Sequence, residues 1–188
     1  MRGRALIHAV GIAVSFSLFL PCAVAQDAKL QPSVKREFKH KAKIESNYDR
    51  FEDETHVRLE SKRVLGGFME DVKMGASFFY KGQKLSTPEY FIFLFVSDTK
   101  GWRFLSETQR ELIALADGER LPLGTLDRDS KVRSGGWVSE IMVKEVPYET
   151  FLKIATAKEV EMKLGKYEFK LKEEHLEALR DLVSRTIQ

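Results

Sequence analysis

The segment EVEMKLGKYEFKLK, residues 159–172, constrains the fold more than any other stretch of this chain. Apolar and charged residues alternate on both sides of Gly165-Lys166, and a glycine that opens a two-residue turn favours a type II′ β-hairpin. The facing pairs are then Val160 with Leu171, Met162 with Phe169 and Leu164 with Tyr167 on one face, and Glu161 with Lys170 and Lys163 with Glu168 on the other. Turn, apolar face and cross-strand charge agree on one register.

A second hairpin is predicted in LIALADGERLPLG, residues 112–124. Asp117-Gly118 is a type I′ turn pair, because both central residues of that turn need positive φ. Ala114 then faces Leu121 and Leu112 faces Leu123, whereas Pro122 indicates an edge strand. In this register Asp117, Glu119 and Arg120 do not converge, so the charged cluster is interpreted as a hairpin tip and not as a site.

Period-two patterns predict three further strands, at 55–60, 72–80 and 90–96. The last, YFIFLFV, is apolar on both faces and is expected to be a central strand covered on both sides. Its aromatic residues are interpreted as core packing and not as a stacking platform for bases or sugars. Helical patterns at 147–158 and 172–187 flank the C-terminal hairpin. The expected fold class is α+β: a mostly antiparallel β-sheet with two C-terminal helices packed on one sheet face.

The first 25 residues have the three parts of a secretory signal. Arg2 and Arg4 precede the uncharged run 9–20, and alanines at 23 and 25 predict cleavage after Ala25. We therefore expect a periplasmic or secreted protein, with an uncleaved anchor as the alternative. The single cysteine, Cys22, leaves with the signal, so the mature chain has no disulfide and no thiolate ligand.

Residues 26–46 are predicted to be a basic flexible linker, followed by one domain at 47–188. The basic residues in this segment are expected to give a weak contact with an anionic surface; they include Lys35, Arg36, Lys39, Lys41 and Lys43. Without the signal the chain has 29 basic and 28 acidic residues, because Arg2 and Arg4 are lost from 31. This balance gives no electrostatic footprint for a nucleic-acid-binding protein.

Residues that could support catalysis are few and scattered. His40, His56 and His175 show no metal-ligand spacing and are expected on the surface, with a spatial His56–His175 site left open. Ser134 precedes Gly135-Gly136, which is interpreted as a turn and not as a nucleophile loop. Residues 126–132 are expected to form a loop, because the glycine and glutamate of a calcium loop are missing. The sequence therefore predicts no metal, no cofactor and no identifiable catalytic residue.

These observations favour an exported bacterial domain that acts without catalysis, binding a protein or a small ligand in the cell envelope. The alternative is a hydrolase whose site is assembled only in three dimensions. A concave pocket with convergent polar groups is the feature by which the tertiary structure can identify a site.

Overall fold

The computed structural model of the protein describes residues 37–66 and 71–186. The expected signal peptide and residues 26–36 of the expected linker lie outside this part of the chain. In the described ranges the chain forms ten β-strands and two α-helices. Neither helix found there has the length and hydropathy that crossing a bilayer requires.

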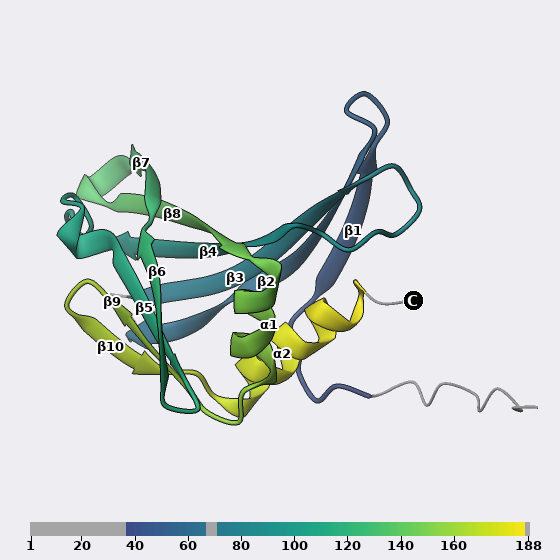
Figure 1. Ribbon diagram of the computed structural model, residues 1–188. Coiled ribbons are helices and arrows are strands. Elements are labelled where there is room, and N and C mark those ends of the chain that lie inside the picture. The colour runs from purple at the N-terminus through teal and green to yellow at the C-terminus, as the bar shows by residue number, and fades with distance from the viewer. Residues whose placement is uncertain (1–36, 67–70, 187–188) are drawn as a thin grey trace, which may run out of the picture. The chain divides into compact units, whose positions relative to one another are not determined.

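The larger of two antiparallel sheets has six strands in the order β1-β2-β3-β4-β8-β7 (Figure 1). They are β1 (Ile44–Asp49), β2 (Glu54–Gly66), β3 (Asp71–Lys81), β4 (Tyr90–Thr99), β7 (Asp127–Val132) and β8 (Val138–Pro147). The smaller sheet has the order β10-β9-β5-β6. Its strands are β5 (Glu111–Ala116), β6 (Glu119–Thr125), β9 (Val160–Leu164) and β10 (Tyr167–Lys170).

The smaller sheet and the helices α1 (Tyr148–Thr156) and α2 (Glu173–Ser184) lie on the same side of the larger sheet (Figure 1). Aromatic contacts along β4 show this arrangement directly. The ring of Phe91 stacks on Phe151 of α1 at 4.0 Å, whereas Phe95 meets Phe169 of β10 at 6.5 Å. One face of β4 is therefore covered first by a helix and then by the smaller sheet. The expected α+β class, with helices on one sheet face, is confirmed.

Both predicted hairpins form, each with one local difference. β9 and β10 pair in the expected register, but Lys170 bonds to Glu159 at 2.6 Å instead of to Glu161. In the other hairpin Asp117 and Gly118 both have positive φ, as a type I′ turn requires. A bulge then places Leu112 opposite Gly124, one residue beyond the expected partner. β6, which contains the proline, is an edge strand as predicted.

Two strand expectations need correction. β4 is central, but only one of its faces is fully covered: Phe91, Phe93 and Phe95 are fully buried, whereas the apolar residues between them are half-buried. On the outer face Leu94 lies beside Val143 and Val96 beside Ile141 of β8, whereas Ile92 lies beside Glu145, so neighbouring side chains cover this face in place of a second layer. Within the predicted loop at 126–132, residues 127–132 form strand β7, because their backbone pairs with β8 along six residues.

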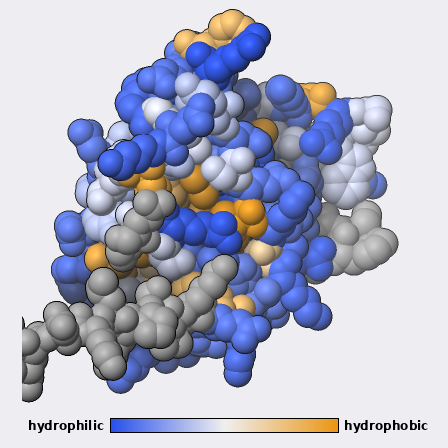
Figure 2. Space-filling model, turned by 90° about the vertical axis from the view of Figure 1, so that its right-hand side faces the viewer, coloured by the Kyte–Doolittle hydropathy of each residue, from blue (hydrophilic) through white to orange (hydrophobic). Residues whose placement is uncertain are grey.

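The N-terminal boundary also differs from the expectation. Strand β1 begins at Ile44, inside the segment predicted to be a linker, and pairs with β2 from its first residue. The connection between β1 and β2 projects from the sheet, and Figure 2 shows hydrophobic surface at its tip. Phe51, in this connection, is 83% exposed.

Candidate functional site

Residues 38–43, which we call the arm, lie along α2. The main-chain N–H of Lys39 donates to the Glu177 carboxylate at 3.2 Å, and His40 Nε2 lies 3.0 Å from Asp181 Oδ2. At the end of the arm the Lys43 carbonyl accepts from the N–H of Glu60 at 2.9 Å. The part of the predicted linker from residue 38 onward is thus held against the fold at both ends.

A strict alternation in FKHKAKI, residues 38–44, explains this placement. Phe38, His40, Ala42 and Ile44 are half-buried, whereas the lysines between them are exposed. Period-two burial is the mark of an extended segment with one face on a core. The alternation is easily overlooked in the sequence, because every second residue of the segment is a lysine and the segment as a whole is strongly basic.

A cavity of about 620 Å³ lies between the arm, the second half of β2 and the start of α2. Its apolar floor consists of Ala42, Leu59, Val64, Leu65, Met74 and Ala178. Its charged rim consists of Lys41, Glu60, Lys62, Arg63, Lys172 and Glu174. Gly66, His40 and His175 complete the wall, and we call this space the His40–His175 cavity. Its volume falls in the range of about 300–1,000 Å³ that is typical of small-molecule sites.

Irregular pairing in β2 shapes one wall of the cavity. The register between β2 and β3 shifts after Leu59 and again after Arg63. Such bulges bend a strand and redirect its side chains, and they are enriched beside functional sites. Gly75 permits the first shift, because a Cβ at this position would lie 2.6 Å from Ser61 Oγ and 2.9 Å from the Leu59 carbonyl oxygen. The close approach of β2 to β3 at the cavity therefore depends on a glycine.

His175, at the third position of α2, is a buried structural residue and not the expected surface histidine. Its Nδ1 accepts from the Lys172 N–H at 3.1 Å, and a second hydrogen bond joins the ring to the main chain of Arg63. Burial lowers the pKa of His175 from its ordinary value, because the charged ring would lose its hydration. The negative charge of Glu174 and the bond to Arg63 act in the opposite direction. One ring nitrogen thus caps the first turn of the helix, and the bond to Arg63 joins that turn to β2.

His40 differs from His175, because one of its ring nitrogens has no partner. Its side chain is only 7% exposed, its Nε2 is held by Asp181, and its Nδ1 is buried without a hydrogen bond. Asp181 also pairs with Arg185 at 3.1 Å, which holds the carboxylate in place. A buried polar atom without a partner in a native structure calls for an explanation, such as a water or a ligand. His40 lines the cavity, but its Nδ1 is itself shielded from solvent.

The third histidine lies elsewhere, so the His56–His175 site left open by the sequence does not form. His56 stacks face to face on Phe79, with ring centroids 4.1 Å apart. Burial lowers its pKa, and the charge of Arg58 acts in the same direction. The histidine pair that the fold brings to one cavity is His40 with His175. The sequence does not indicate this pair, because His40 stands in a lysine-rich segment with the composition of a linker.

The rim charges of the cavity are only partly paired. Lys62 bonds to Glu60 at 2.7 Å and Arg63 to Asp71 at 3.3 Å. Within the described ranges neither Lys41 nor Lys172 takes part in an ion pair. The arm and the junction before α2 thus each bring an unpaired ammonium group to the rim.

The chemistry available in the cavity is limited. None of the described residues that line it has a hydroxyl or thiol side chain. Across residues 37–66 and 71–186, no three His, Cys, Asp or Glu side chains are grouped so as to hold a metal ion. The described lining can therefore supply apolar contact, charge and hydrogen bonds, but no hydroxyl or thiol nucleophile.

The charged residues of the β5–β6 tip remain apart, as predicted. The Asp117 carboxylate accepts from the main-chain N–H groups of Lys158 and Glu159, each at 2.9 Å, so it fixes the segment after α1 as well as its own turn. These backbone bonds lower the pKa of Asp117. Glu119 bonds instead to Lys153 at 2.7 Å. The charged residues of the tip thus connect the β5–β6 hairpin to α1 and to the segment that follows α1.

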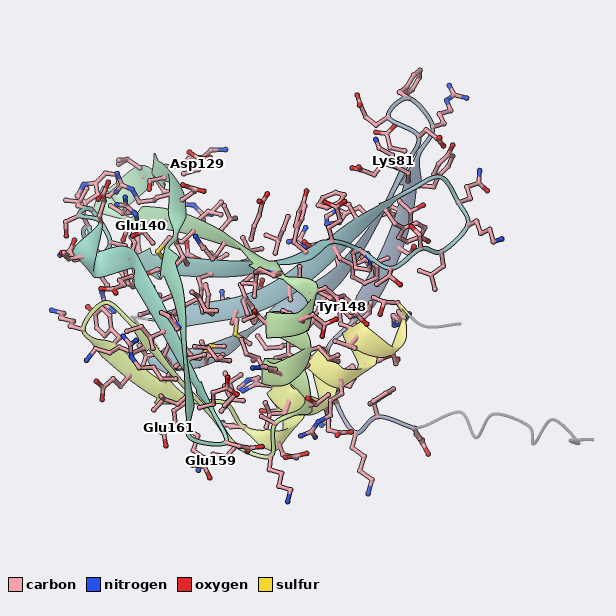
Figure 3. All side chains as sticks on the ribbon, in the orientation of Figure 1. Lys81, Asp129, Glu140, Tyr148, Glu159 and Glu161 are labelled. Carbon is pink, nitrogen blue, oxygen red and sulfur yellow. The ribbon has the colours of Figure 1, made fainter. Side chains whose placement is uncertain are left out.

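Sequence reasoning also missed Glu140 of β8, a fully buried carboxylate (Figure 3). Its oxygens accept from the N–H groups of Arg103 at 2.9 Å and Phe104 at 3.1 Å, and Arg128 Nη1 lies 3.6 Å away. Glu140 thereby anchors the segment that carries the chain from β4 to the smaller sheet. Its contacts are structural, and no cavity described above includes it.

Ser134, the residue before Gly135-Gly136, lies in a short exposed 3-10 turn between β7 and β8. Asp127 and Asp129 are exposed on β7 and belong to its pairing with β8. None of these three residues lines the His40–His175 cavity. This cavity, with an apolar floor and a charged rim, is the candidate functional site. Comparison of the chain with family models, curated proteins and solved structures found no match.

Proposed function

We propose that this chain is an exported, non-enzymatic binding module whose small ligand occupies the His40–His175 cavity. The observation that carries the proposal is the cavity itself: about 620 Å³, with an apolar floor and charged groups arranged around it. Apolar walls with a few placed polar groups are the usual form of a small-molecule site.

The hydrolase alternative has less support. A histidine paired with an aspartate, as in His40–Asp181, also occurs in hydrolytic sites, but there the histidine activates a nucleophile. The described lining offers no hydroxyl or thiol for this role. The pair instead holds the arm against α2, where it forms one wall of the cavity.

A neutral dye tests the binding proposal without reference to charge. N-phenylnaphthylamine fluoresces on entering apolar sites, and we expect it to bind the full mature protein with saturable signal. Val64→Trp places a large ring in the floor and should abolish the signal. Val143→Trp is the matched control, because it makes the same change on the outer face of β8 and should retain the signal. Equal binding by both variants would contradict the proposal.

Export is the second part of the proposal and is supported by the signal-like sequence 1–25. Expression of the whole chain in a Gram-negative host should deliver a periplasmic protein whose mature N-terminus is Gln26. We also propose that the basic segment makes a weak contact with an anionic surface, because the side chains of Lys39, Lys41 and Lys43 are exposed and available for such a contact. Retention of the full-length chain in the cytoplasm would contradict export.

A further inference from the structure

We infer that the His40–His175 cavity takes an amphipathic anion: an apolar body of fatty-acyl type with one negatively charged head group. The inference rests on the proposed binding function and adds the chemical class of the ligand. It depends on three features of the cavity: the apolar floor, the balance of rim charges and the polar groups at the start of α2.

The floor requires an apolar body. Leu59, Met74 and Ala178 are buried, and Val64 and Leu65 are half-buried around them. Since the first three are already shielded, the binding free energy comes from removing the exposed parts of Val64 and Leu65, and the apolar surface of the ligand itself, from water. A fully hydrated sugar or a bare inorganic ion offers no surface for this gain, so the cavity favours an alkyl, isoprenoid or aromatic body.

The rim requires a negative head group. Four cationic and two anionic side chains surround the opening, and the rim pairs Lys62 with Glu60. Arg63 is balanced by Asp71 from outside the lining. Among the described rim residues this leaves Lys41, Lys172 and Glu174 without ion pairs, an excess of one positive charge. An anionic ligand group near Lys41 and Lys172 would neutralise this excess positive charge, whereas a cationic group would be repelled by both lysines.

The start of α2 adds to the same preference. Lys172 precedes the helix, and the partial positive charge of a helix N-terminus favours negative groups. His40, which Asp181 holds through Nε2, also lines the cavity and keeps the arm in place beside α2. The polar end of the ligand therefore lies toward the arm and the first turn of α2.

A series of probes with one chain and three head groups tests the sign of the charge. Laurate, dodecanol and dodecylamine have the same twelve-carbon chain and are negative, neutral and positive at neutral pH. Each competes with N-phenylnaphthylamine for the full mature protein, below its micellar concentration. We expect laurate to bind tightest and dodecylamine weakest, with at least a tenfold difference between these two. Equal affinities, or the reverse order, would overturn the inference.

Charge reversals locate the head group. Lys41→Glu and Lys172→Glu should each weaken laurate binding roughly tenfold, as expected for reversing one charge about 5–6 Å away in a water-like medium. The same variants should strengthen dodecylamine binding. Lys131→Glu, on the exposed edge strand β7, makes an identical change in net charge away from the cavity and should leave both affinities within about twofold. An equal effect of all three reversals would show that only net charge matters.

Removal of the one unpaired anion of the rim gives the opposite result. Glu174→Gln should tighten laurate binding and weaken dodecylamine binding, because the like charge next to the head group is gone. Since Glu174 is exposed on α2, circular dichroism should show an unchanged fold. Unchanged laurate affinity in this variant and in both cavity lysine variants would refute the head-group assignment.

Failure of this inference can be distinguished from failure of the proposed function. If the three probes displace the dye equally and the rim variants have no effect, the cavity binds ligands but does not select anions. If no probe and no dye binds, and Val64→Trp changes nothing, both the binding function and the inference are wrong. The neutral dye decides between these results, because it does not respond to the rim charges.

Discussion

Replacement of Glu140 by glutamine tests whether a buried carboxylate anchors the segment that leads from β4 to the smaller sheet. Both of its oxygens are used: the N–H groups of Arg103 and Phe104 donate to it at 2.9 and 3.1 Å, and Arg128 lies 3.6 Å away. Glutamine has the same shape but only one accepting oxygen. Its amide NH₂ must face one of the two main-chain N–H donors, and the guanidinium of Arg128 loses its opposing charge.

The expected cost follows from these contacts. One hydrogen bond to a charged acceptor is lost, the other becomes a bond to a neutral acceptor, and one buried N–H is left without a partner. Together these effects should lower the free energy of unfolding by about 2–4 kcal/mol. Domains have total stabilities of about 5–15 kcal/mol, so the loss is a large fraction. For a domain of this size the melting temperature should fall by roughly 5–15 °C.

Urea unfolding followed by circular dichroism and tryptophan fluorescence measures this cost. Glu145→Gln is the matched control, because Glu145 lies on the same strand but is exposed, and its replacement should change stability by less than about 0.5 kcal/mol. Trp102 precedes the two donor residues, so its fluorescence reports on the anchored segment. A Glu140→Gln protein as stable as the Glu145→Gln control would refute the anchoring role.

Three further predictions concern residues that stabilise a helix start, a turn and a connection between elements. Burial lowers the pKa of His175 below its ordinary 6.5, so the unfolded chain binds more protons near that pH and stability falls as the pH decreases through it. His175→Gln keeps an acceptor for the Lys172 N–H, and its urea midpoint should fall less than that of the wild type between about pH 8 and pH 5.5. Gly165→Ala should lower the free energy of unfolding by more than about 2 kcal/mol, because φ is +57° and the new Cβ would lie 2.5 Å from the Gln109 carbonyl oxygen. Gly118→Ala, with open space around it, should lower the free energy of unfolding by only about 1 kcal/mol, and chemical denaturation measures both values. Asp117→Ala should speed amide exchange in the segment after α1, yet leave dye binding in the cavity intact, and loss of binding by the folded variant would contradict the structural role of the tip.

Local patterns were sufficient to predict much of the fold. The pairing of Met162 with Phe169 follows from a two-residue turn and strict alternation, since a turn of fixed length determines the register of the strands on both sides. The helices α1 and α2 follow from apolar residues at helical spacing, and Leu176, Leu179 and Leu182 are buried as that spacing requires. These features depend on residues that are close in sequence.

Predictions from local signals were wrong where a second element decides the outcome. The charged run at 127–132 pairs as an edge strand because β8 offers a free edge, which the run itself does not indicate. The register of β5 and β6 holds near the turn and slips at Leu112, where a bulge inserts one residue. Such shifts arise from packing against the neighbouring strand and leave little trace in hydrophobic alternation.

The sequence by itself thus determined the turns, the alternating faces and the α+β class, because each depends on steric and burial preferences within a few residues. Only the tertiary structure decided that the arm docks on α2 and that His40 and His175 share a cavity. The partners of these groups lie more than a hundred residues away, as the bond between His40 and Asp181 shows. A side chain becomes part of a site when distant elements remove it from water and surround it, and no local pattern records that event.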